Sequence, residues 1–84
     1  MEYYVYILHS LSIQKYYIGI TANLDKRLEE HNAGVSYKAW TRRANDWIIV
    51  YKEQFESKKL ALKREKEIKG YKGGNSFKNL ITSR

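Results

Sequence analysis

Two short segments near the start of the chain have the hydrophobic pattern of strands. Residues 3–9, YYVYILH, and residues 16–20, YYIGI, are rich in aromatic and β-branched side chains, which favour a pleated, half-buried surface. The polar connection between them, SLSIQK, has the length of a hairpin loop, and a third strand-like segment, WIIVYKEQF, covers residues 47–55. The pattern therefore predicts an antiparallel sheet of three strands.

The alternation within the first two segments sorts their tyrosines by face. Successive side chains of a strand point to opposite faces. The first strand is expected to have one face of Tyr4, Tyr6 and Leu8 and another of Tyr3, Val5 and Ile7. The second is expected to have one face of Tyr17 and Gly19 and another of Tyr16, Ile18 and Ile20. If the strands are antiparallel neighbours, Tyr6 and Tyr17 can face one cleft, whereas packing within the sheet explains Tyr3, Tyr4 and Tyr16.

Helical spacing and capping residues predict three helices, at residues 22–33, 58–70 and 76–82. The expected caps and stops are Thr21 or Asn23 and Gly34 for the first helix, and Ser57 and Gly70 for the second. The resulting order, ββαβαα, predicts an α+β fold in which a three-stranded antiparallel sheet is flanked by helices. We expect a single domain over residues 1–84.

The composition adds a strong positive charge. Sixteen Lys and Arg against nine Asp and Glu give a net charge of +7 and a pI near 9.7, which makes nucleic acid the first partner to consider. Many small basic proteins bind nothing specific, so charge alone leaves the partner open. The start, MEYYVYIL, has neither the form of a signal peptide nor the length of a membrane span, so we expect a soluble, cytoplasmic protein with no membrane contact.

The chain has no cysteine and only two histidines, His9 and His31. This excludes disulfide bonds, cysteine-based zinc sites and all-histidine metal sites. A bound metal ion would rest on carboxylates and water, which suits Mg²⁺ or Mn²⁺.

Polar side chains interrupt the apolar stripes of the first two helices. Glu65 lies between Ala61 and Ile68 on the stripe that should face the sheet, where an acid costs free energy unless it is paired or binds a metal. It belongs either to an ion pair with an arginine or to a site. Arg27 and His31 share the stripe of the first helix, either as a solvated flank or as part of a site. Several such residues together favour a site.

Tyr6, Tyr17, Arg27, His31 and Glu65 form a plausible set for phosphodiester hydrolysis. One carboxylate with water can hold a Mg²⁺ ion that polarises a phosphate oxygen and stabilises the leaving group. An arginine can bind two non-bridging oxygens at once. A tyrosine can orient or deprotonate the attacking water, although its pKa of about 10 must be lowered by a metal or an arginine for it to act as a base at neutral pH.

These segments together resemble the GIY-YIG nuclease superfamily. YVY at 4–6 and YIG at 17–19 are similar to its paired motif, and LDKRLEEHN at 24–32 is similar to its helix with an arginine and, four residues later, a histidine. ALKREKEIK at 61–69 resembles the segment that carries its glutamate. The resemblance covers nearly the whole chain, in the same order, and is closest to the small single-domain members described as predicted endonucleases.

The resemblance implies a role for each of the five residues. Tyr6 and Tyr17 would be the two motif tyrosines, one of them the general base, with the choice between them open. Arg27 would bind and polarise the scissile phosphate, and His31 would lie beside the nucleophile. Glu65 would be the sole protein ligand of one divalent metal ion, Mg²⁺ or Mn²⁺.

Four other positions match or depart from the family pattern. By this resemblance, Gly19 would permit close packing at the site, and Asn75 would correspond to a final asparagine of the family. Tyr4 stands where the first motif has its glycine, and Ile20 stands where repair-type relatives can carry a lysine. These 84 residues include no separate DNA-binding domain, so we expect sequence-specific cutting only if a protein partner supplies the specificity; the sequence leaves the oligomeric state open.

The segment YKAWTRRAND is the expected nucleic-acid contact. Lys38, Arg42 and Arg43 can neutralise phosphates, and Trp40 can stack on unpaired bases. This mixture suits branched or single-stranded DNA, although Trp40 can instead anchor the segment in the core. The lysines of the second helix are mostly a solvated face, from which Lys69 can also guide a backbone.

The leading functional hypothesis is a divalent-metal-dependent DNA endonuclease selective for branched, nicked or single-stranded substrates, with a role in repair or recombination. The first alternative is a non-catalytic nucleic-acid-binding module with the same fold. The second is a nuclease directed at RNA.

Overall fold

The computed structural model describes residues 2–34, 43–72 and 74–82 of the chain. The observed order is ββαβαα, as the sequence pattern predicts. The strands are β1, Tyr3–Ser10, β2, Lys15–Thr21, and β3, Trp47–Phe55; the helices are α1, Leu24–Asn32, α2, Lys58–Lys69, and α3, Asn75–Thr82. In this part of the chain no helix is long and apolar enough to cross a membrane.

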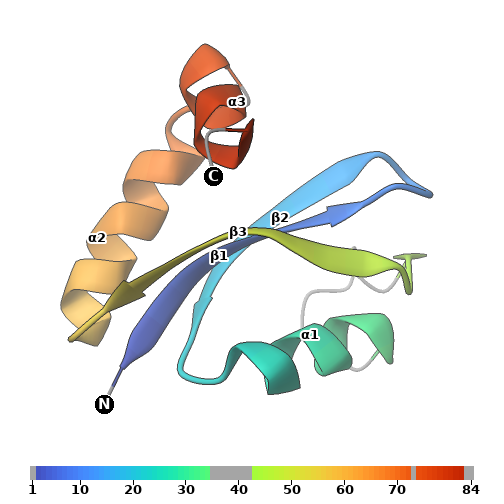
Figure 1. Ribbon diagram of the computed structural model, residues 1–84, viewed down its shortest axis with the longest axis horizontal. Helices are drawn as coiled ribbons and strands as arrows, with labels where there is room; N and C mark the ends of the chain where they lie inside the picture. Colours follow the sequence, from blue (N-terminus) through green and yellow to red (C-terminus); the bar gives the residue numbers. More distant parts are fainter. Residues whose placement is uncertain (1, 35–42, 73, 83–84) are drawn as a thin grey trace.

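The strands form one antiparallel sheet in the order β2-β1-β3 (Figure 1). The central strand, β1, pairs with β2 through a tight hairpin in which Tyr6 lies opposite Gly19. It also pairs with β3, with a shift of register between Ile7 and Leu8. The expected sheet is therefore confirmed, and β1 is the strand whose side chains have neighbours on both sides.

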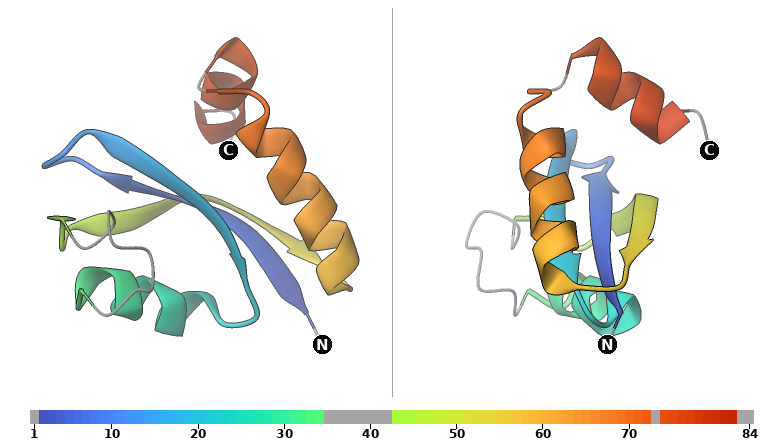
Figure 2. Two further views of the ribbon diagram at one scale, coloured as in Figure 1. Left: turned by 180° about the vertical axis from the view of Figure 1, so that it is seen from behind. Right: turned by 90° about the vertical axis from the view of Figure 1, so that its left-hand side faces the viewer.

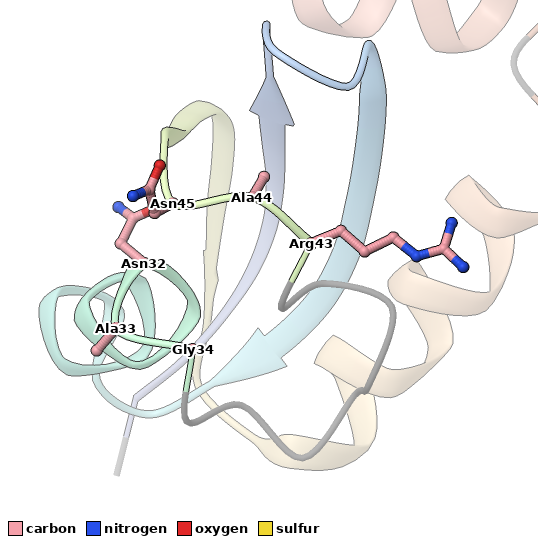
Figure 3. Close-up of a pocket in the computed structure, with 6 residues that line it drawn as sticks. All are labelled: Asn32, Ala33, Gly34, Arg43, Ala44 and Asn45. Carbon is pink, nitrogen blue, oxygen red and sulfur yellow. The ribbon is translucent and has the colours of Figure 1, made fainter.

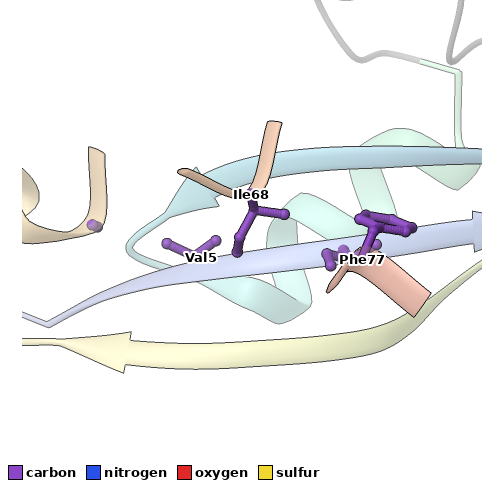
Figure 4. Close-up of a cluster of buried hydrophobic side chains, with 5 residues drawn as sticks. Val5, Ile68 and Phe77 are labelled. Carbon is purple, nitrogen blue, oxygen red and sulfur yellow. The ribbon is translucent and has the colours of Figure 1, made fainter. Parts of the chain in front are cut away.

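Helices cover the two faces of the sheet unequally, because α2 and α3 lie over one face and α1 lies along the other (Figure 2). The core under α2 and α3 is built on Val5 and Ile7 of β1, into which Ile68 and Phe77 pack (Figure 4). Ala61 completes this cluster and, like Val5, Ile7 and Ile68, has no exposed surface. Its two strand residues, Val5 and Ile7, are positions that alternation along β1 assigns to one face.

The core under α1 is built mainly from large aromatic side chains. Tyr6 and Leu8 of β1 pack there with Tyr17 of β2 and with Trp47, the first residue of β3. Leu24 and Leu28 of α1 cover them as partly buried neighbours. The buried tyrosines and the buried His31 therefore lie on this face of the sheet, whereas the tyrosines that pack against the other core are only partly buried.

Side-chain caps fix where two helices begin. Asn23, rather than Thr21, caps α1, and its side-chain oxygen accepts a hydrogen bond from the backbone N–H of Lys26 at 3.1 Å. Ser57 caps α2 in the same way, accepting from the N–H of Leu60 at 3.3 Å, as predicted. Such caps satisfy backbone donors that the first turn of a helix leaves without partners.

Candidate active site

Tyr6 and Tyr17 lie on the same face of the sheet as diagonal neighbours. Tyr6 is opposite Gly19, and Tyr17 is opposite Leu8, so both rings point toward α1. The two ring centroids are 6.1 Å apart. A Cβ atom at Gly19 would lie 2.7 Å from the Tyr6 hydroxyl oxygen and 2.9 Å from the Tyr17 ring. The absence of a side chain at Gly19 is therefore what lets the rings occupy this space.

His31 enters the same cluster from α1. Its Nε2 lies 3.4 Å from the Tyr6 hydroxyl, and its ring centroid is 4.7 Å from that of Tyr17. His31 and Tyr6 are each only 1% exposed, so the contact is shielded from solvent. A solvated helix flank therefore does not describe His31, and its place on the apolar stripe is the sequence signal for its burial.

Burial favours the neutral form of the His31 ring. Desolvation lowers the pKa of His31 below its ordinary value, and the Arg27 cation lowers it further, while the Glu30 carboxylate opposes them. Within the described part of the chain, Nδ1 is buried without a hydrogen-bond partner. A neutral imidazole has one donor and one acceptor nitrogen, so Nε2 of His31 can either accept a hydrogen bond from the Tyr6 hydroxyl or donate one to it, depending on the tautomer.

Asn32 fixes the position of His31 against β3. Its side-chain amide donates to the carbonyl oxygen of Trp47 at 3.0 Å and accepts from the N–H of Trp47 at 2.7 Å. This pair of bonds imitates a strand pairing and joins the last turn of α1 to the first residue of β3. Neither Asn32 nor Trp47 is predicted as a site residue from the sequence. The only sequence signal is an amide directly after His31, and its partner is revealed only when the chain is folded.

Arg27 lies one turn before His31 on α1, at the rim of the cluster. Its guanidinium Nε is 3.1 Å from a carboxylate oxygen of Glu30. A cavity of about 220 Å³ lies beside it, lined by Thr21, Ala22, Asn23, Lys26, Arg27 and Glu30. Arg27 is therefore partly exposed and borders open space at the end of β2, while its helix neighbour His31 is buried.

Glu65 lies on α2 and is not part of the cluster, because α2 packs on the opposite face of the sheet. Its side chain is only 18% exposed, as its place on the inward stripe predicts, and forms an ion pair with Lys69 at 3.4 Å. The sequence leaves open an ion pair between Glu65 and an arginine. Glu65 does form an ion pair, but its partner is a lysine, so the predicted partner is wrong. Arg64 pairs instead with Glu53 of β3 at 3.0 Å.

The side chains present fit a metal ion held by one carboxylate and water better than a protein cage. No group of three or more His, Asp or Glu side chains lies together among the described residues. Glu65 is the largely buried carboxylate of α2, and Mg²⁺ commonly binds through one or two carboxylates while keeping several waters. Lys69 would have to release Glu65 for that to happen.

The remaining predicted contacts fall in different places. Arg43 is exposed and borders a second cavity, of about 370 Å³, together with Asn32, Ala33, Gly34, Ala44 and Asn45 (Figure 3). Asn75 is exposed at the start of α3. The predictions for Lys38, Trp40 and Arg42 lie outside the described residues.

Comparison with known proteins gives consistent matches. A family model for the GIY-YIG catalytic domain matches residues 2–78. A UPF0213 protein of Natronomonas pharaonis is 41% identical over 68 residues, covering 81% of this chain and 78% of the relative. A UPF0213 protein of Staphylococcus haemolyticus is 39% identical over 70 residues, covering 83% of each. The solution NMR structure of a UPF0213 protein from Bacillus halodurans superposes with a TM-score of 0.54 at 31% identity, covering 99% of this chain and 84% of that one.

Proposed function

Because this chain belongs to the GIY-YIG catalytic-domain family, and its motifs resemble those of that nuclease superfamily, we propose that it is a divalent-metal-dependent endonuclease that cuts DNA. The observation that carries the proposal is the contact between Tyr6 and the neutral, buried His31, next to Tyr17 and one helical turn from Arg27. Burying polar groups in a core costs free energy that aliphatic side chains would not cost, so the retention of this polar contact favours a chemical role.

Arg27 is the residue proposed to bind the scissile phosphate. Its guanidinium borders the open cavity at the end of β2, where its ion pair with Glu30 is available for exchange with a phosphate. An arginine can donate two parallel hydrogen bonds to the non-bridging oxygens. These donors would stabilise the negative charge of the transition state.

The tyrosines and His31 are proposed to move the proton of the attacking water. A free phenol is a poor base at neutral pH because its pKa is about 10. If one tyrosine removes a proton from water while passing its own proton to His31, no phenolate has to accumulate. Nε2 of His31, 3.4 Å from the Tyr6 hydroxyl, lies where it could accept that proton.

Glu65 is proposed to hold the metal ion, Mg²⁺ or Mn²⁺, which when bound would neutralise charge on the phosphate and the leaving oxygen. Helix α2 packs over β1 and β2, and β2 is an edge strand. A phosphate within reach of both Glu65 and Arg27 would therefore lie at the β2 edge of the sheet. Lys69, once separated from Glu65, could contact the same strand of nucleic acid.

The burial of Tyr6 and His31 supports a second candidate, a nucleic-acid-binding module without turnover. Both side chains are almost fully covered, so water could reach them only if the residues that cover them moved apart.

For either candidate, we favour DNA with branched or single-stranded regions as the nucleic acid, with roles in repair or recombination. RNA is the alternative substrate.

A nicking assay tests the proposal. The full chain would be mixed with supercoiled plasmid and with labelled flap and fork DNAs in Mg²⁺, Mn²⁺ or EDTA. We expect metal-dependent cutting that falls at least a hundredfold in Arg27→Ala and Glu65→Ala, on the order expected for lost charge stabilisation. Glu67→Ala is the matched control, because Glu67 is an exposed carboxylate on the same helix, paired with Arg64.

Cutting that survives both substitutions would refute the assignment of the site. DNA binding without cutting in any metal would instead support the binding module. A substrate series in which single-stranded RNA displaces branched DNA would move the proposal to an RNA-directed nuclease.

A further inference from the structure

One row of side chains crosses all three strands at the hairpin end of the sheet. His9 of β1 lies opposite Tyr16 of β2 and opposite Ile48 of β3. We call these three residues the hairpin platform. By alternation they share the face of Ile7, which is buried under α2 and α3. At the platform, however, Tyr16 is 42% exposed and Ile48 is 57% exposed.

The exposure follows from the length of the hairpin. The β1–β2 hairpin extends beyond α2, so the helix that buries the row of Ile7 does not reach the row of His9 (Figure 2). Adjacent exposed aromatic and aliphatic side chains on one face are typical of a binding surface, whereas single ones are ordinary.

Neighbouring rings hold the platform in place. The ring centroids of His9 and Tyr16 are 4.5 Å apart, with 33° between the ring planes. Phe77 of α3 packs against Tyr16 in an edge-to-face arrangement, with ring centroids 5.1 Å apart and ring planes at 81°. Tyr16 therefore presents a ring whose orientation is fixed before any ligand binds, which reduces the entropy lost on binding.

The charges around the platform favour an anionic partner. Lys78 is exposed and directly follows Phe77, the α3 residue whose ring contacts Tyr16. Lys15 is also exposed at the hairpin end, but alternation along β2 places its side chain on the opposite face from Tyr16. Asp46, a carboxylate at this end of the sheet, accepts hydrogen bonds from the side-chain hydroxyls of Ser10 and Ser12. The whole chain carries a net charge of +7. A partner that is negatively charged and also has flat apolar faces is a single-stranded nucleic acid.

We infer that the hairpin platform binds an unpaired base of a single-stranded nucleic acid by stacking on Tyr16, with the exposed Lys78 contacting its backbone. This inference rests on the proposed function, because it supplies a place for the single-stranded part of a branched substrate away from the tyrosine–histidine cluster. Exposed aromatics on a sheet are a common way to bind unpaired bases.

The test measures binding of a labelled single-stranded oligonucleotide and of a duplex of the same length, without metal, by fluorescence anisotropy. Tyr16→Ala is expected to weaken single-strand binding about tenfold, which is the usual effect of losing one stacked base, and to leave duplex binding unchanged. Tyr16→Phe keeps the ring and is expected to bind as the native protein does. Leu11→Ala is the matched control, since Leu11 is exposed in the hairpin turn.

A second variant guards against a folding defect. Ile48→Glu places an acid on the platform without removing a packed ring, and it is also expected to weaken single-strand binding. Native affinity in both Tyr16→Ala and Ile48→Glu would overturn the inference. So would sedimentation showing a dimer that either substitution dissociates, because the platform would then contact a second copy of the chain. If Arg27→Ala abolishes cutting but retains single-strand binding, the inference about the platform is unaffected. The proposed nuclease site and the platform can therefore be refuted independently of each other.

Discussion

Gly19 shows how one missing methyl group shapes the candidate site. The family resemblance predicts that Gly19 permits close packing at the site. The structure shows that the space is filled by the rings of Tyr6 and Tyr17, both within 3 Å of where a Cβ would stand. The glycine is therefore a condition for the geometry of the tyrosines.

Replacing Gly19 by alanine is expected to displace at least one tyrosine ring. Overpacking of a core typically costs about 1–3 kcal/mol, so the free energy of unfolding measured in urea should fall by that amount, and the cutting rate should fall with it. Gly70→Ala is the comparison, because Gly70 ends α2 with a φ of −69° that alanine adopts readily. A Cβ there would lie 3.2 Å from the backbone oxygen of Glu67, which is close but less so than the contacts under 3 Å at Gly19. Native activity in Gly19→Ala would show that the ring positions are not critical.

His31 is the residue whose burial ties stability to pH. Because its pKa is lowered in the folded state, the unfolded chain binds a proton at a pH where the folded chain does not. Stability therefore rises with pH across that interval and is lost as the pH falls below the ordinary histidine pKa of about 6.5.

We predict that the free energy of unfolding decreases between about pH 7 and pH 5, and that His31→Gln flattens this decrease. Urea titrations at several pH values measure it. His9→Gln changes the other histidine, on the opposite face of the sheet, and serves as the comparison. A slope in His31→Gln equal to that of the native protein would assign the effect to other groups.

At the scale of elements, the contact between α1 and β3 organises the site. Asn32 ends α1 and holds both backbone groups of Trp47, so the helix that carries Arg27 and His31 is fastened to the edge strand β3. No local sequence pattern predicts this contact, because Asn32 and Trp47 are 15 residues apart in the sequence and periodicity describes only near neighbours.

Asn32→Ala should therefore loosen α1 from the sheet. Two hydrogen bonds of about 1 kcal/mol each are lost, and the freed groups of Trp47 must find water, so we expect a loss of about 2 kcal/mol in urea unfolding. Asn79→Ala, at an exposed position of α3, provides the reference substitution. An unchanged unfolding free energy in Asn32→Ala would mean that the helix is held by its apolar stripe alone.

At the scale of the whole molecule, the sheet separates the proposed groups. The tyrosine–histidine cluster lies under α1 and Glu65 lies on α2, on opposite faces. A substrate that engages both would have to pass an edge of the sheet, and the cavity beside Arg27 at the end of β2 favours the β2 edge. Basic side chains at several points of the surface, together with the net charge of +7, would then contact phosphates over an extended path.

That path predicts a marked salt dependence of DNA binding. Each phosphate neutralised by a lysine or arginine releases counterions, so affinity should fall more than tenfold between about 50 mM and about 200 mM salt. Anisotropy titrations at several salt concentrations give the slope, and Lys15→Ala should make it shallower by about one contact. Binding that is insensitive to salt would contradict an electrostatic interface.

The sequence alone determined the element order, the alternation of the strands and the inward positions of His31 and Glu65, because these follow from periods of 2 and 3.6 residues that are local properties of the chain. It also assigned Tyr6 and Tyr17 to one face, as the pairing confirms. Only the tertiary structure decided that Asn32 holds Trp47, that Gly19 makes room for two rings, and that Tyr16 stays exposed where α2 ends. Each of these depends on which distant segments meet, and a local pattern carries no information about that.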